Sequence, residues 1–285
     1  MPHTTSAGPG IYYETTGDAA NPPIVLISGA SAQLIWWRDE FVQSLVDRGL
    51  YVVRLDNRDV GLSAKLGGPD DTAAVYSVGD MADDVCRVLD ALGIASAHIV
   101  GQSLGGGIAQ VMAITRPQRV RSMVVFYTIP AFEAQYLTDE LQRSALTLTG
   151  TDAPPTPTTR EEIIEDFYQR ELNTRSTGYE FDETWMRGYI AACVDRGHCP
   201  GGVARQAQAA MQLGDLRPAL QKLSLPVAVV HGREDRLLRV EAGFEIGRVV
   251  PNAELHIYAG LGHEFPRALW DEFANIIART TQRAV

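Results

Sequence analysis

The stretch Ala97–Gly107 constrains the fold of this chain more than any other. It reads Ala-His-Ile-Val-Gly-Gln-Ser-Leu-Gly-Gly-Gly, so a short apolar run meets a serine, Ser103, that has a glycine two positions away on each side. A helical pattern of apolar residues begins at Ile108. This spacing predicts a sharp turn from a buried strand into a helix, with Ser103 in a strained backbone conformation. Its hydroxyl would stand above the sheet edge, beside the first N–H groups of the helix.

Strands and helices alternate through most of the chain. Apolar runs typical of strands in a parallel sheet occur at 24–27, 51–55, 120–127 and 227–231, with further strands expected at 11–16 and 254–258. Amphipathic helices are predicted at 37–49, 77–92, 240–250 and 266–279. The alternation predicts an α/β fold in which helices cover both faces of the sheet. It also favours a sharp turn at Ser103 over a merely flexible glycine loop.

The alternation stops after Pro130 and resumes at Pro226. Between them the sequence predicts only helices, at 136–148, 159–172, 182–195 and 203–213, and a loop rich in proline and threonine at 151–159. We interpret residues 131–216 as a helical cap, or lid, inserted between two strands of the sheet. Residues 1–130 and 217–285 then form one core domain.

The charge and the cysteines exclude several classes of protein. A formal charge of −10 over 285 residues argues against nucleic acid or an anionic membrane as a partner. No apolar run reaches the roughly 18 residues that span a bilayer, and no secretory signal is visible, so we expect a cytoplasmic protein. Cys86, Cys193 and Cys199 are too few and too scattered for a disulfide framework. His198 beside Cys199 lacks the paired spacing of a metal site, so no metal is expected.

Polar residues follow three of the predicted strands. Ser103 follows one, Glu234 and Asp235 follow another, and His263 lies in the loop after the last. Because the carboxyl ends of parallel strands meet at one edge of a sheet, we expect these side chains to converge. An imidazole can take the proton of a serine hydroxyl, and a carboxylate behind the imidazole fixes its tautomer.

Two adjacent acids compete for the position behind His263. Only one of Glu234 and Asp235 should point inward, and we choose Asp235 from its distance past the strand end. The histidines that lie within strands or at a strand end are interpreted as structural: His98, His231 and His256.

Four segments resemble the α/β-hydrolase fold superfamily, and the resemblance covers nearly all of the chain. They are Gly101–Gly105, His231–Asp235, Gly262–His263 and Asp56–Ser63, the last with Asp59 where glycine is usual. The resemblance implies a mostly parallel sheet of the eight-stranded type with an inserted helical cap, and it supports Asp235 as the acid. Residues 37–41 together with 56–59 are similar to the aclacinomycin methylesterase group and related small-ester hydrolases.

The loop that would bind a developing oxyanion departs from the usual superfamily pattern. Many members begin it with His-Gly, whereas this chain has Ser28-Gly29-Ala30. The donor in that loop is a backbone N–H, so a change of side chain leaves the chemistry intact. By position we assign the two donors to the backbone N–H groups of Ala30 and Leu104.

The predicted function is hydrolysis of a carboxylic ester or lactone, a small-molecule substrate, without a metal or an organic cofactor. Ser103 would attack the carbonyl, with His263 as base and Asp235 behind it. Carbon–carbon bond hydrolases and cofactor-free perhydrolases keep the serine and remain alternatives, as does a non-enzymatic ligand-binding member of the fold. Haloalkane dehalogenases and epoxide hydrolases carry aspartate at this position, which argues against both. The sequence leaves a homodimer open.

The predicted cap should cover Ser103 and select the substrate. Trp36, Tyr136, Trp185 and Met211 are the candidate substrate-binding residues, although such side chains also suit the packing of helices against one another. We expect a mostly apolar cleft that accepts a bulky or ring-containing ester better than a long flexible chain.

Overall fold

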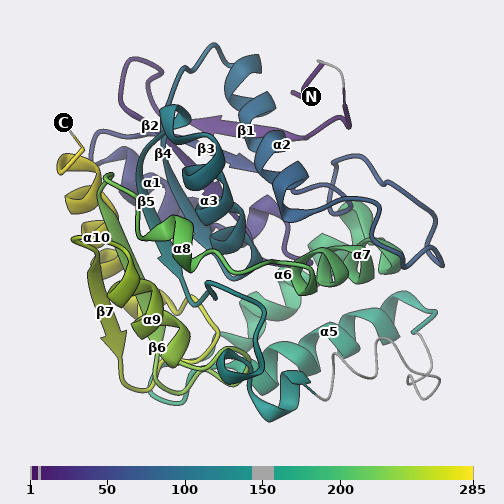
Figure 1. Cartoon of the computed structure of the whole chain (residues 1–285). Helices are drawn as coiled ribbons and strands as arrows, with labels where there is room; N and C mark the ends of the chain where they lie inside the picture. Colours follow the sequence, from purple (N-terminus) through teal and green to yellow (C-terminus); the bar gives the residue numbers. More distant parts are fainter. Residues whose placement is uncertain (1, 6–7, 143–156, 285) are drawn as a thin grey trace.

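The computed structural model describes residues 2–5, 8–142 and 157–284. Within them seven strands form one sheet in the order β1-β3-β2-β4-β5-β6-β7 (Figure 1). The strands are β1 (Tyr13–Thr16), β2 (Pro23–Ile27), β3 (Tyr51–Leu55), β4 (Ala97–Gln102), β5 (Val120–Phe126), β6 (Val227–Gly232) and β7 (Glu254–Tyr258). Only β1 pairs in an antiparallel manner, with β3, and the other neighbours are parallel. The expected α/β architecture is confirmed, with seven strands in the described residues instead of eight. Beside β1, the described N-terminal residues form an isolated bridge between His3 and Tyr12.

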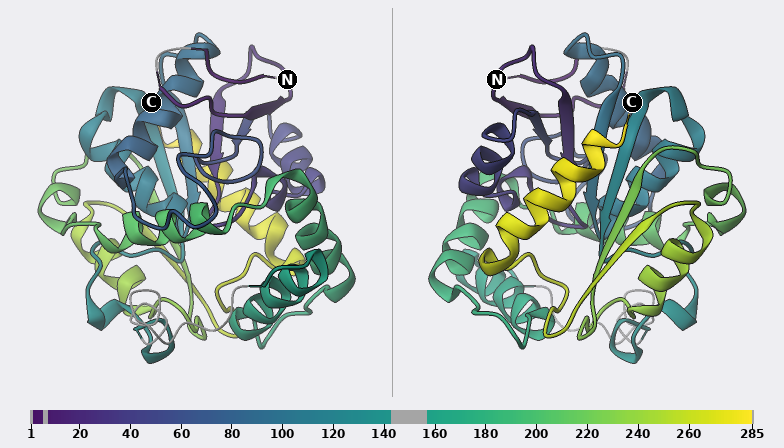
Figure 2. Two further views of the ribbon diagram at one scale, coloured as in Figure 1. Left: turned by 90° about the vertical axis from the view of Figure 1, so that its right-hand side faces the viewer. Right: turned by 90° about the vertical axis from the view of Figure 1, so that its left-hand side faces the viewer.

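Helices cover both faces of the sheet, and each face has its own hydrophobic core. Helices α1 (Asp39–Val46) and α10 (Trp270–Gln282) lie on one face, and Figure 2 shows α10 in yellow crossing it. The other face is covered by α2 (Val78–Ala91), α3 (Leu104–Thr115), α8 (Arg217–Leu220) and α9 (Glu241–Val249). Successive residues of β2 alternate between the two cores, since Val25 belongs to one and Leu26 to the other. No helix in the described part of the chain is long and apolar enough to cross a membrane.

In the described part of the chain between β5 and β6, helices are joined by irregular segments and no strand of the sheet occurs. It contains η3 (Ala134–Tyr136), α5 (Arg160–Thr174), α6 (Glu183–Gly197) and α7 (Pro200–Met211), and we call residues 131–216 the insertion. Helices α5, α6 and α7 lie together beyond one end of the sheet (Figures 1 and 2). The loop predicted at 151–159 lies mostly outside the described residues, and the helix predicted at 136–148 lies partly outside them.

The helix predicted at 37–49 begins two residues later than expected, at Asp39. A separate turn, η1 (Leu34–Trp36), precedes it, and Trp37 has an extended backbone with ψ of 91°. The carbonyl of Trp37 accepts a hydrogen bond from Arg54 Nη1 at 2.6 Å, and its ring is fully buried. Because the core holds both the carbonyl and the ring of Trp37, the chain turns there before the helix starts.

An ion pair buried in the core connects the loop after β3 to the insertion. Asp59, which stands where the resembling superfamily usually has glycine, adopts a left-handed conformation with φ of 73°. Its carboxylate accepts two hydrogen bonds from Arg205 of α7, at 2.9 and 2.6 Å, and both side chains are almost fully buried. Burial acts to raise the pKa of Asp59, but the bonds from Arg205 and from the N–H of Leu66 outweigh it and hold that pKa below its ordinary value.

Candidate active site

Ser103 lies in a strained turn between β4 and α3. Its backbone has φ of 52° and ψ of −120°, a conformation that residues other than glycine rarely adopt. The flanking glycines are required by space. A Cβ on Gly101 would lie 2.1 Å from the carbonyl oxygen of Gly105, and one on Gly105 would lie 2.3 Å from the carbonyl oxygen of Ile27. Backbone packing therefore fixes the position of Ser103 at the carboxyl end of the sheet.

His263 and Asp235 are in direct contact. His263 Nδ1 lies 2.8 Å from Asp235 Oδ2, although 28 residues separate them in the chain. The other carboxylate oxygen of Asp235 accepts hydrogen bonds from the backbone N–H groups of Leu237 and Leu238, at 2.8 and 2.9 Å. Because an ionised carboxylate only accepts hydrogen bonds, Nδ1 of His263 carries the proton and Nε2 is left free to act as a base.

The surroundings of Asp235 favour its ionised form. Burial acts to raise its pKa, but the charge of His263 and hydrogen bonds from His231 and His263 hold the pKa well below its ordinary value. Glu234, the competing acid, is directed elsewhere, since its Oε2 accepts a hydrogen bond from the N–H of Gly260 at 2.6 Å. Of the two adjacent acids, only Asp235 contacts the histidine.

His231 forms a second layer behind the acid. It is fully buried at the end of β6, and its Nε2 lies 3.4 Å from Asp235 Oδ2 and 3.1 Å from the carbonyl oxygen of Leu238. Sequence reasoning treated His231 as a strand-end residue and gave it no part in the site. Its spacing of four residues before Asp235, at the end of a strand, was the only available signal.

Ser103 and His263 line the same cavity, which has a volume of about 200 Å³. Ala30 and Leu104 line it too, and their backbone N–H groups have no hydrogen-bond partner among the described residues. The other lining side chains are almost all apolar: Val78, Ile129, Phe132, Leu141, Ala207, Ala210, Met211, Leu213, Leu237 and Leu238, with Gly107 and Thr128 completing the wall. The cavity thus joins a hydroxyl, an imidazole and two free N–H groups to an apolar surface.

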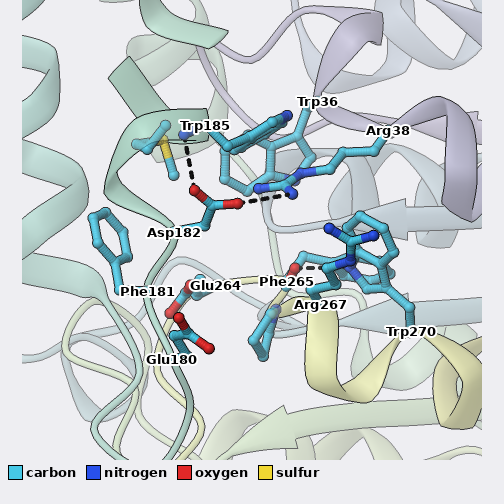
Figure 3. A pocket seen from close by; sticks show the side chains of 12 residues that line it. Trp36, Arg38, Glu180, Phe181, Asp182, Trp185, Glu264, Phe265, Arg267 and Trp270 are labelled. Carbon is cyan, nitrogen blue, oxygen red and sulfur yellow. Dashed lines mark hydrogen bonds and ion pairs between the residues drawn. The ribbon is translucent and has the colours of Figure 1, made fainter. Parts of the chain in front are cut away.

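Of the four predicted substrate-binding residues, only Met211 lines this cavity. Trp36 and Trp185 line a separate, much smaller depression of about 30 Å³, shown in Figure 3. There the guanidinium of Arg38 stacks 3.2 Å from the centre of the Trp185 ring, and it also pairs with Asp182. The rings of Trp36 and Trp185 also pack edge-on at 5.9 Å, so these two tryptophans join helix α6 to the core.

Trp36 and Tyr136 also form hydrogen bonds and packing contacts near the site. Trp36 Nε1 donates a hydrogen bond to Oε1 of Gln102, the residue before Ser103, at 2.9 Å. Tyr136 is buried in a small cluster with Leu137 and Leu238, and its hydroxyl accepts a hydrogen bond from Arg217. Sequence reasoning missed Leu141, Leu213 and Leu237, because a leucine that lines a cavity has no pattern that distinguishes it from a core leucine.

Glu171 of α5 is a charged neighbour of His263 that the sequence did not indicate. Burial raises the pKa of its carboxyl to about 7, although the charge of His263 acts in the opposite direction. Helix α5 ends against the His263 loop, since the carbonyl of Thr174 accepts a hydrogen bond from the N–H of His263 at 2.9 Å. The insertion thus brings a titratable group to the site from more than 90 residues away in the chain.

The described residues contain no group of three His, Cys, Asp or Glu side chains that could hold a metal ion. The three cysteines are free thiols at separate places. Cys86 is packed in the core, burial raises the pKa of Cys193 to about 12, and Cys199 precedes α7.

Comparison with known proteins agrees with this architecture. Residues 22–266 match the family described as the alpha/beta hydrolase fold. The chain is 26% identical to rhodomycin D methylesterase DnrP of Streptomyces peucetius, with 96% of this chain and 95% of that protein covered. It is 27% identical to a 2-hydroxy-6-oxononadienedioate/2-hydroxy-6-oxononatrienedioate hydrolase of Paraburkholderia phymatum, over 89% of this chain and 84% of that protein.

A solved structure shows the same fold over the full length of the chain. The enol-lactonase from Burkholderia xenovorans LB400 aligns with a TM-score of 0.79 and 21% identity, over 99% of this chain and all of that one. The methylesterase relatives also confirm the resemblance to the aclacinomycin methylesterase group that the sequence motifs indicated. Since the family match spans most of its length, the chain belongs to the α/β-hydrolase fold family, and it is an enzyme of the hydrolase class.

Proposed function

We propose that this enzyme hydrolyses carboxylic esters through an acyl-enzyme on Ser103. The observation that carries the proposal is that Ser103 and His263 line one cavity with Ala30 and Leu104, whose N–H groups have no partner among the described residues, while Asp235 binds Nδ1 of His263. Ser103 Oγ attacks the carbonyl carbon as His263 Nε2 takes its proton. The N–H groups of Ala30 and Leu104 stabilise the oxyanion. His263 then protonates the leaving alcohol, and water releases the acid by the same steps in reverse order.

The polarity of the cavity favours an uncharged substrate. Among the described residues that line it, His263 is the only side chain that can carry charge near neutral pH. The dienedioate named for one group of relatives has two carboxylates, which would lose their hydration here without a cation to replace it. An ester group, such as the one that a methylesterase cleaves, has no such cost. We therefore prefer ester hydrolysis to carbon–carbon bond cleavage of a dicarboxylate.

The volume of the cavity limits the size of the substrate group that can bind next to Ser103. Its volume of about 200 Å³ compares with the roughly 150 Å³ of an engineered protein cavity that binds benzene. The space next to Ser103 fits one ring or a short branched chain. We propose that residues 131–216 act as a cap that selects this group, because Phe132, Met211 and Leu213 from the insertion form part of the wall.

The proposal is tested with a set of p-nitrophenyl esters of short, long and aromatic acids, assayed with the wild-type enzyme and Ser103→Ala. We expect the wild type to hydrolyse short and aromatic esters and the variant to lose turnover by about 10⁴-fold or more. A fluorophosphonate probe should label Ser103 in the wild type only, as mapped by peptide mass spectrometry. Labelling elsewhere with activity intact in the variant would overturn the nucleophile. Absence of serine-dependent turnover on every ester would favour a ligand-binding member of the fold.

A further inference from the structure

The loop that holds Ala30 is bound by a buried side chain of the insertion. Ser31, the next residue, has a left-handed backbone with φ of 63°. Its N–H donates a hydrogen bond to Oε1 of Gln206 at 2.8 Å, across 175 residues of sequence. Gln206 lies in α7 and is fully buried. The loop conformation at Ser31 is therefore held by a contact from outside the core.

The oxygen and the nitrogen of the Gln206 side-chain amide each form a hydrogen bond, so the orientation of the amide is fixed. Its Nε2 donates a hydrogen bond to the carbonyl oxygen of Arg58 at 2.7 Å. A rotation of the amide would leave the buried carbonyl of Arg58 without its partner, at a cost of about 1–3 kcal/mol, and would also break the bond to the partly buried N–H of Ser31. The preceding residue, Arg205, forms the buried ion pair with Asp59 and anchors the same turn of α7. Gln206 is thus a rigid support for the N–H of Ser31.

This support constrains the backbone around Ala30. The peptide between Ala30 and Ser31 is planar, so holding the N–H of Ser31 limits the ψ angle of Ala30. A strained φ at Ser31 costs on the order of 1 kcal/mol or more and persists only if the surroundings impose it. Without the bond to Gln206, the loop is free to relax, and the N–H of Ala30 would no longer keep a fixed direction toward the cavity.

We propose that Gln206 is a positioning residue for the oxyanion donor Ala30. The inference rests on the proposed function, in which Ala30 binds the oxyanion. It also explains how the insertion affects the chemical step, because Ala207 and Ala210, on the same helix, form the cavity wall. One helix then both contacts the substrate and orients a group that stabilises the transition state.

The test compares Gln206→Met with Gln208→Met in the full-length enzyme. Gln208 is a matched control because it lies on the same helix and its Oε1 also accepts a backbone hydrogen bond, from Ala74 at 2.9 Å, away from the oxyanion loop. Each rate is divided by the concentration of active sites, which is titrated with a phosphonate, so that unfolded protein in a sample does not lower it. Gln206→Asn, which keeps the amide but shortens the side chain, serves as a second variant if the Met variant does not fold.

We expect Gln206→Met and Gln206→Asn to lower kcat by about tenfold or more with KM within about threefold, since the donor acts mainly in the transition state. The affinity for phenylethaneboronic acid, which forms a tetrahedral adduct with a serine, should fall by a similar factor. Gln208→Met should change either quantity by less than about twofold. If the Gln206 and Gln208 variants have equal kcat while Ser103→Ala is inactive, the positioning role is wrong and the proposed function stands. Activity retained in Ser103→Ala would instead refute the proposed function itself.

Discussion

The core and the insertion line the same cavity, but different kinds of contact hold their residues in position. Ser103 follows β4 directly, and backbone clashes in its turn fix it, whereas Ala30 lies three residues after β2 in a loop that Gln206 of α7 binds. Ala207 and Met211 reach the cavity because α7 is anchored by Arg205 to Asp59, 146 residues away. Ser103 is therefore positioned locally, whereas the Ala30 loop and the residues of the insertion depend on a few long-range contacts.

The two regions also differ in the chemistry that they supply. The hydroxyl, the imidazole and the free N–H groups all come from the core. Among its described residues, the insertion contributes only apolar side chains to the cavity wall: Phe132, Leu141, Ala207, Ala210, Met211 and Leu213. We therefore expect substitutions of these core groups to change the rate of the chemical step. Apart from Gln206, which binds the loop of Ala30, substitutions in the insertion should change stability or the choice of substrate.

The largest effect is expected from the acid behind His263. Asp235→Asn should lower kcat by about 10⁴-fold, because the asparagine amide no longer fixes the imidazole tautomer that leaves Nε2 free. The matched control is Glu234→Gln, which alters the adjacent acid that binds Gly260 and should stay within about tenfold of the wild type. Steady-state kinetics on one p-nitrophenyl ester measures both. A larger loss in the Glu234 variant would reverse the assignment.

The next effect concerns the anchor of the insertion. Arg205→Met leaves the buried carboxylate of Asp59 without its partner, which typically costs about 3–5 kcal/mol in the free energy of unfolding. Urea denaturation followed by tryptophan fluorescence measures the loss. Arg160→Met is the control, since its pair with Asp195 is exposed, and its effect should be much smaller. Equal losses in the two variants would show that the buried pair is not the anchor.

A smaller effect, on the preference among esters, should distinguish residues that line the cavity from aromatic residues that only pack nearby. Met211→Ala removes apolar contacts with a bulky acyl group and should raise KM for aromatic esters by about tenfold relative to acetate. Trp185→Ala and Tyr136→Ala should leave the ranking of short, long and aromatic esters unchanged, because neither residue lines the cavity. An altered ranking in these two variants and none in Met211→Ala would contradict the placement.

The smallest effect should appear in the pH dependence of stability. Burial raises the pKa of Glu171 to about 7, so the folded protein binds a proton there that the unfolded chain releases above its ordinary pKa of 4.5. The free energy of unfolding should therefore fall as the pH rises from 4.5 to 7. Glu171→Gln should remove this contribution and flatten the curve, as measured by urea denaturation at several pH values. Glu161→Gln, on the exposed face of α5, is the control and should leave the slope unchanged. A slope that persists in Glu171→Gln would assign it to another group.

The turn at Ser103 could be predicted from the sequence because local rules govern it. The spacing of Gly101, Ser103 and Gly105 permits one kind of turn, and backbone clashes enforce it in the structure. The buried strands likewise appear as apolar runs, so the α/β architecture and the helical nature of the insertion could be predicted. The choice between Glu234 and Asp235 needed distance along the chain and a family resemblance, since two adjacent acids differ little in local pattern.

The tertiary structure alone decided which residues line the cavity and which support the site. Trp36 and Trp185 are residues of the kind expected in a pocket, but Trp185 stacks with Arg38 and Trp36 packs edge-on against Trp185. Gln206 and Glu171 reach the site from helices whose direction depends on packing against the core. The conformation of a turn is determined by steric limits between neighbouring residues, and these limits follow directly from the residue types in the sequence. The packing of the insertion on the core depends on contacts between residues more than ninety positions apart, and no local pattern encodes them.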